Sequence, residues 1–148
     1  MRALILALTL AACTAEPAKQ EAPVTPEAEA ANSVQAALAR MPSWENARAA
    51  GVDFRAVGQE PGWIVDIYTQ DRIVALLDYG ETLVEFPRTE PSYPAEGATR
   101  FTAETDGHTL TITYRRFPCE DVMSGEPYPS TVEVVFDGRT LTGCGRSV

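Results

Sequence analysis

Apolar residues recur at every second position in short runs from Gly51 to the end of the chain. This alternation turns one face of an extended segment toward a core and the other toward water, which is the pattern of β-strands. The clearest runs are Phe54-Ala56, Trp63-Val65-Ile67, Ile73-Ala75-Leu77, Leu110-Ile112-Tyr114 and Val132-Val134-Phe136. Roughly eight such strands, joined in order, predict a mainly β fold: a small up-and-down antiparallel barrel with a short N-terminal helical segment.

Turn and cap residues divide the chain between these runs. Asp106-Gly107 and Asp137-Gly138 predict two-residue hairpins, and Pro61-Gly62 predicts a type II turn. Ahead of the strands, Ser33 is suited to cap a first helix and Ser43 a second one.

The Asp137-Gly138 hairpin also fixes a register. A two-residue loop there pairs Phe136 with Arg139, and therefore Thr131 with Cys144. Cys144 then reaches the rim of the barrel from which Cys119 departs, with one strand between them. We expect a Cys119–Cys144 disulfide that fastens the intervening loop, which must fold over the end of that strand.

The N-terminus predicts export and lipidation. Arg2 precedes the apolar run Ala3 to Ala12, as in a secretory signal peptide, and this run is far shorter than the roughly 20 residues of a membrane-spanning helix. Leu10-Ala11-Ala12-Cys13 resembles a bacterial lipobox, in which the cysteine carries lipid and begins the mature chain. Residue 14 is Thr14, which by resemblance to lipoproteins favours sorting to the outer membrane, with the domain facing the periplasm.

Three segments follow from this N-terminus. Residues 1–12 are the signal peptide, 13–32 the lipidated cysteine with a tether predicted to be disordered, and 33–148 the barrel domain. Lipid on Cys13 leaves Cys119 and Cys144 as an even pair in an oxidising compartment.

Charge limits the range of partners. Removal of residues 1–12 takes away Arg2, and 21 acidic residues then face 11 basic ones, a net charge of about −10. This excess of negative charge argues against nucleic acid and against anionic membrane surfaces. It permits a cationic protein such as lysozyme, while the membrane is reached through the lipid on Cys13.

The loop between the two paired cysteines is the candidate binding loop. Its candidate residues are Glu120, Asp121, Met123, Ser124, Gly125 and Tyr128. An exposed patch around Tyr93, Met123 and Tyr128 would favour binding. The alternative is that Met123 and Tyr128 plug the end of the barrel while the acidic residues are merely solvated.

Catalytic chemistry has few candidate residues. His108 is the single histidine, and Ser124 lacks the Gly-x-Ser-x-Gly elbow that exposes a nucleophile. Glu120 and Asp121 are two adjacent carboxylates without the remainder of a calcium loop. We therefore predict no catalytic residues, no metal site and no cofactor.

Three stretches carry a family resemblance. They are Gly51-Val52-Asp53-Phe54-Arg55-Ala56-Val57-Gly58-Gln59-Glu60-Pro61-Gly62-Trp63, then Met123-Ser124-Gly125 with Tyr128-Pro129, and Gly143-Cys144-Gly145. Together they resemble a family of uncharacterised Gram-negative envelope lipoproteins, sometimes found beside or fused to domains of membrane-bound inhibitors of c-type lysozyme. The resemblance implies the location and a small barrel.

The inhibitors themselves share less with this chain. Their Ser-Gly-x-x-Tyr segment is similar to Ser124-Gly125-Glu126-Pro127-Tyr128, but their later Trp and Lys-Gly pair is matched only by Asp137-Gly138-Arg139, with no Trp before it. We expect a non-enzymatic binding module of the cell envelope. The alternatives are a lysozyme-inhibitor-like protein, a structural envelope component, or a carrier of a small apolar ligand.

Overall fold

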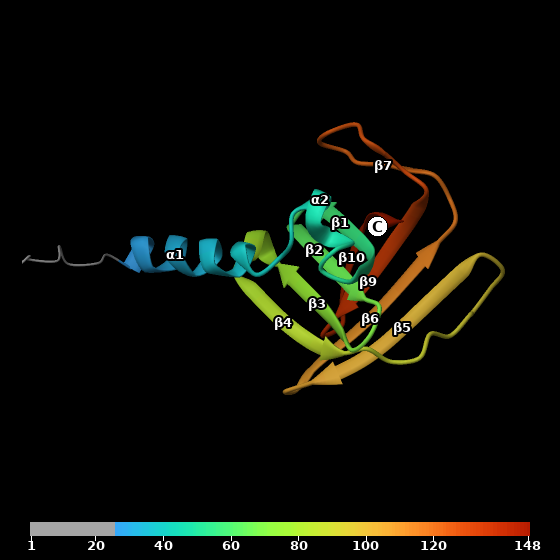
Figure 1. Ribbon diagram of the computed structural model, residues 1–148, viewed down its shortest axis with the longest axis horizontal. Helices are drawn as coiled ribbons and strands as arrows, with labels where there is room; N and C mark the ends of the chain where they lie inside the picture. Colours follow the sequence, from blue (N-terminus) through green and yellow to red (C-terminus); the bar gives the residue numbers. More distant parts are fainter. Residues whose placement is uncertain (1–25) are drawn as a thin grey trace, which may run out of the picture.

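The computed structural model describes residues 26–148, and the predicted signal peptide and Cys13 lie outside this range. Eight antiparallel strands form one sheet in the order β4-β3-β2-β1-β10-β9-β6-β5 (Figure 1). Their bounds are β1 Val52–Gln59, β2 Gly62–Tyr68, β3 Arg72–Leu77, β4 Thr82–Pro87, β5 Ala98–Thr105, β6 His108–Arg115, β9 Ser130–Phe136 and β10 Arg139–Ser147. The first strand pairs with the last, so the sheet curls into a barrel that is nearly closed, with a seam between β4 and β5. The predicted up-and-down barrel is confirmed.

The hairpin turns have the backbone that their sequences predict. Asp106 and Gly107 have φ of 45° and 81°, and Asp137 and Gly138 have 48° and 81°. Two successive positive φ values match the twist of the flanking strands. The predicted register of the last hairpin is also confirmed, because Arg139 lies opposite Phe136 and Cys144 opposite Thr131.

The barrel interior is filled by apolar side chains from all eight strands. The large buried members include Trp63, Ile67, Leu77 and Phe136. Trp63 has room because two inward positions are glycines: a Cβ on Gly58 would lie 2.1 Å from the Trp63 Nε1, and one on Gly143 would lie 2.7 Å from its Cζ2. Each large side chain buried in this way contributes about 1.5–3 kcal/mol.

Two helices precede the barrel, and the first begins earlier than predicted. Helix α1 spans Pro26–Ala39 and α2 spans Trp44–Ala47, with Ser43 at the expected N-cap position. The expectation that Ser33 caps the first helix is wrong, because α1 already covers residues 26–32 of the predicted tether. Proline is favoured at the first helical position and Ala, Glu and Gln are strong helix formers, which explains the earlier start.

Most of α1 projects away from the barrel (Figure 1). Its last turns contact the short 3-10 turn η1, Asp78–Gly80, where a Cβ on Gly80 would lie 2.9 Å from the Val34 Cγ1. Among residues 26–148, no helix is long and apolar enough to cross a membrane.

The turn between β1 and β2 differs from the prediction. A type II turn needs positive φ at its third residue, whereas Gly62 is absent from the positive-φ glycines and begins β2, after a cis Glu60–Pro61 bond. The type II assignment is therefore wrong. Gly62 serves a close approach instead, because a Cβ there would lie 2.7 Å from the Cδ1 of Tyr79.

A buried ion pair joins β1 and β2 on the outer wall of the barrel. Arg55 of β1 and Asp66 of β2 are both buried and joined by two hydrogen bonds of 2.6 and 2.7 Å. The same guanidinium donates to the Pro42 carbonyl at 2.8 Å, so this ion pair fastens the segment before α2 to the barrel. A buried pair of this kind needs such extra bonds to offset its desolvation.

Candidate binding site

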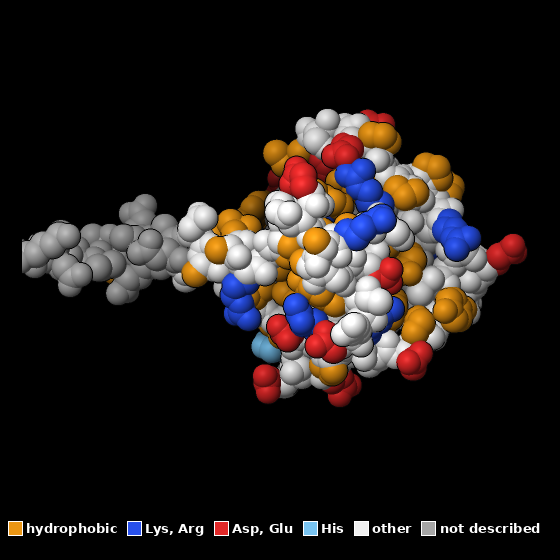
Figure 2. Space-filling view, viewed as in Figure 1, with side chains coloured by type: hydrophobic (Ala, Val, Ile, Leu, Met, Phe, Trp, Pro, Cys, Tyr) orange, Lys and Arg blue, Asp and Glu red, His pale blue; other side chains and the backbone are white. Residues whose placement is uncertain are grey.

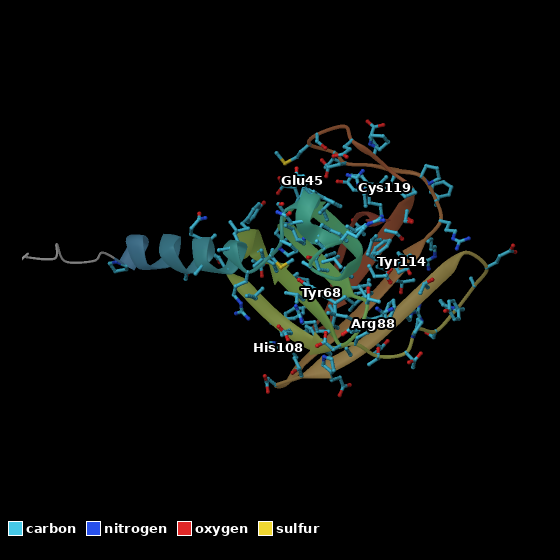
Figure 3. All side chains as sticks on the ribbon, in the orientation of Figure 1. Glu45, Tyr68, Arg88, His108, Tyr114 and Cys119 are labelled. Atoms are coloured by element: carbon cyan, nitrogen blue, oxygen red, sulfur yellow. A yellow bond between two sulfur atoms is a disulfide. The ribbon has the colours of Figure 1, made fainter. Side chains whose placement is uncertain are left out.

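The loop between the paired cysteines forms an arm, defined as residues 119–129, which lies at the top of the view in Figure 1. Short strands β7, Cys119–Glu120, and β8, Pro127–Tyr128, pair within it. The Cys119–Cys144 disulfide, with 5.5 Å between the Cα atoms, joins its base to β10 as predicted. Cys119 lies at the opposite end of the barrel from His108 (Figure 3).

The arm lies against the outer wall of the barrel. Side chains alternate along a strand, and the inward positions beside Cys144 are Gly143 and Gly145, where a Cβ would meet Trp63 and Phe54. The sulfur of Cys144 therefore points outward. The alternative that the loop plugs the barrel end is wrong, because the disulfide draws the arm across β9 onto the outside of β10.

Asp121 organises the tip of the arm. Its Oδ1 accepts hydrogen bonds from the amides of Ser124 and Met123 at 2.7 and 3.1 Å and from the Ser124 hydroxyl at 2.8 Å. Its Oδ2 accepts one from the Gln59 Nε2 at 2.7 Å. These donors, Gln59 first, lower the pKa of Asp121 to about 2. The carboxylate thus ties the arm to the end of β1.

The second half of the arm rests on a stack of aromatic and cationic groups. The Cζ of Arg146 lies 4.5 Å from the Tyr128 ring centroid and 4.6 Å from that of Trp44, and the Arg55 Cζ lies 4.9 Å from Trp44. Glu126 of the arm also pairs with Arg146. Cations over aromatic faces attract the ring electrons, and this stack holds β8 on the wall.

Tyr128 is therefore not an exposed binding residue. Its side chain is only 6% exposed, whereas Met123 and Tyr93 are each 73% exposed. Arg146 and Trp44 cover the Tyr128 ring, so Tyr128 does not form an exposed patch with Tyr93 and Met123. Val122 joins Met123 as the exposed apolar tip of the arm. Figure 2 shows acidic and hydrophobic side chains next to each other over the arm, at the top of the view.

A groove of about 490 Å³ lies between the arm and the outer wall of β1, β10 and β9. Four carboxylates line it, and Arg115 is the one cation among its lining residues. These carboxylates belong to Glu60, Glu120, Asp121 and Glu133. The groove is thus a negatively charged recess whose roof is fixed by a disulfide and by the Asp121 hydrogen bonds.

The predicted loop residues contribute unequally to this groove. Glu120 and Asp121 line it, while Ser124 and Gly125 shape the arm. The Ser124 hydroxyl donates to Asp121, and Gly125 has φ of 69°, which favours glycine. The sequence does not predict that Glu60, Glu133 and Gln59 belong to the site, because no spacing in the sequence connects these positions to the arm.

The remaining charged residues singled out in the sequence lie at the other end of the barrel. His108 Nδ1 lies 2.7 Å from Asp137 Oδ2, joining the β5–β6 and β9–β10 hairpins. Arg139 donates two hydrogen bonds to Asp78, at 2.8 and 2.9 Å. Within the described part of the chain, no group of three or more His, Cys, Asp or Glu residues is arranged to hold a metal ion.

Comparison with family models, with curated proteins and with solved structures finds no match to this chain.

Proposed function

We propose that this protein is an outer-membrane lipoprotein, anchored through Cys13, that acts as a non-enzymatic binding module at the cell envelope. Its ligand is a basic segment of a partner protein, and its binding site is the groove beneath the arm. The observation that carries this proposal is the recess of about 490 Å³ lined by four carboxylates and a single cation.

The carboxylates differ in what they offer a ligand. Asp121 is occupied by four hydrogen bonds and shapes the groove. Glu120 and Glu133, by contrast, take part in none of the ion pairs among residues 26–148. A guanidinium or ammonium group entering the groove would gain charge-assisted hydrogen bonds from these two side chains, which are about twice as strong as neutral ones.

A binding role agrees with the chemistry of the lining residues. Both sulfur atoms of the groove are joined in the disulfide, and the histidine of the chain lies at the far end of the barrel, bonded to Asp137. The acidic net charge of the chain would also speed the approach of a cationic partner. Lysozyme is a cationic protein to which the family resemblance points, and it serves as a probe.

The test is a titration of the purified full chain with lysozyme and with a tetra-arginine peptide, at low and at high salt. The groove variant is Glu60→Gln/Glu120→Gln/Glu133→Gln, and its control, Glu85→Gln/Glu96→Gln/Glu104→Gln, removes the same charge from exposed positions elsewhere. We expect the groove variant to weaken binding at least about tenfold and the control less than about twofold. Equal weakening by both variants would overturn the site, and no binding of either probe would overturn the cationic ligand.

A further inference from the structure

A second cavity, of about 290 Å³, opens beside the groove on the outer wall of β1, β2 and β3. It shares Val57, Gly58 and Gln59 with the groove, so the two recesses adjoin across the end of β1. Its other walls include Leu38 of α1 and Leu76 of β3, and no charged residue lines it. An acidic recess therefore continues into an apolar one.

Tyr79 forms one side of this second cavity in an unusual backbone conformation. Its φ of 57° and ψ of 25° lie in the left-handed region, which is disfavoured for a bulky side chain. Its side chain is nevertheless 62% exposed. Residues held in such conformations gather at binding sites, where the surrounding structure maintains them.

Tyr79 is positioned by residues of the apolar cavity and by a residue of the acidic groove. Its ring lies against Gly62, where a side chain would collide with it. Its hydroxyl donates to Glu60 Oε2 at 3.0 Å, and Glu60 lines the acidic groove. The tyrosine thus presents an aromatic surface to the apolar cavity while its polar end contacts the groove.

We propose that the apolar cavity receives an aromatic side chain of the same basic segment, with Tyr79 as the surface on which it packs. The site would then recognise an aromatic residue close to a basic one. This inference rests on the proposed function. Charge complementarity selects a basic segment as the occupant, because the acidic groove binds its basic residue. The residue next to that basic residue in the segment is then placed beside Tyr79. Paired aromatic rings gain energy beyond the area they bury.

The experiment uses labelled peptides and the full chain. The probes are Ser-Phe-(Ser)n-Arg-Arg peptides with n from 0 to 2, each compared with versions in which Phe or both Arg are replaced by Ser. We expect the peptide with one of these spacings to bind at least about tenfold more tightly than its Phe→Ser version. The burial of a Phe side chain and one aromatic ring pair together contribute more free energy than a tenfold change in affinity requires.

Two variants test the role of Tyr79. Tyr79→Gly removes the ring from a left-handed position that glycine adopts freely. Gly62→Ala keeps the ring but places a Cβ 2.7 Å from its Cδ1, so the ring must move. Tyr93→Ala, at another exposed tyrosine that lies outside both cavities, is the control.

Tyr79→Gly and Gly62→Ala should both abolish the preference for Phe over Ser, and Tyr93→Ala should preserve it. Peptides that bind equally with and without Phe would overturn this inference and leave the basic-segment site intact. A preference for Phe that survives in Tyr79→Gly would also overturn it. If no Arg peptide binds, the inference and the proposed function both fail.

Discussion

At the scale of single residues, Asp121 joins the tip of the arm to the barrel. Both carboxylate oxygens accept hydrogen bonds, three from the arm itself and one from Gln59 on β1. Since the pKa of Asp121 is lowered to about 2, the folded state favours the charged form. The same side chain therefore closes the turn at the tip and fixes the arm to the barrel.

We predict that Asp121→Asn loosens the arm while the barrel stays folded. An amide offers one acceptor in place of two charged ones, so the exchange protection of the Met123 and Ser124 amides should fall more than about tenfold. Amide hydrogen exchange followed by NMR measures this change, with Glu120→Gln as the control for loss of a neighbouring charge. Unchanged protection in Asp121→Asn would contradict the role given to this carboxylate.

The pH dependence of the arm follows from the same residue. A pKa lowered on folding contributes stability that is fully present above the unfolded value near 3.9 and is lost as pH falls toward about 2. In the wild type, arm protection should therefore decline between pH 4 and 2, and in Asp121→Asn this decline should be absent.

The sequence predicts some of these residues but not their pairing. Asp121 and Ser124 could be identified as loop residues of interest because turn-forming and acidic residues cluster there. The bond from Gln59 to Asp121 spans 62 positions and depends on the arm lying on the outer wall. The sequence leaves open whether Tyr128 is exposed or buried, because its burial depends on Trp44 and Arg146, which reach it from distant parts of the chain.

At the scale of elements, the arm and β10 act as one unit through the disulfide. The strand pairing and the hairpin register could be predicted because Asp-Gly turns and apolar alternation are local signals. The outward direction of the Cys144 side chain could not be predicted. Its inward neighbours on β10 are Gly143 and Gly145, which have no apolar side chain that would identify the face toward the core. Glycine is needed at both positions because a Cβ there would collide with Trp63 or Phe54, and these rings reach β10 only in the folded barrel.

We predict that Cys119→Ser/Cys144→Ser keeps the barrel and loses the groove. The bond closes a separation of 25 residues, so its loss should lower the free energy of unfolding by about 3.5 kcal/mol. Urea unfolding measures this change, and titration with the tetra-arginine peptide reports on the groove. The chemically reduced wild type is the matched control and should resemble the double variant. Undiminished peptide binding by a folded double variant would show that the groove does not depend on the arm.

At the scale of the whole molecule, α1 lies in the chain between Cys13, the proposed anchor, and the barrel that carries the proposed binding site. Most of α1 projects from the barrel (Figure 1). Leu38 of α1 lines the apolar cavity, so the helix that follows the proposed anchor in the chain also contributes to the proposed site. A helix of 14 residues spans about 21 Å, which holds the barrel at a distance from the point where α1 begins.

The proposed lipid on Cys13 would attach the protein to the membrane without any ionic contact. Each buried acyl CH₂ contributes about 0.8 kcal/mol, so a protein carrying several acyl chains should stay with the membrane through repeated washing at high salt. Cys13→Ser should abolish the incorporation of labelled fatty acid and release the protein into the soluble fraction, whereas Cys119→Ser/Cys144→Ser should remain labelled and membrane-bound. High-salt washing separates the two modes of attachment, because an ionic contact weakens with salt and a lipid does not. Labelling that persists in Cys13→Ser would show that another residue carries the lipid and that the lipobox is misassigned.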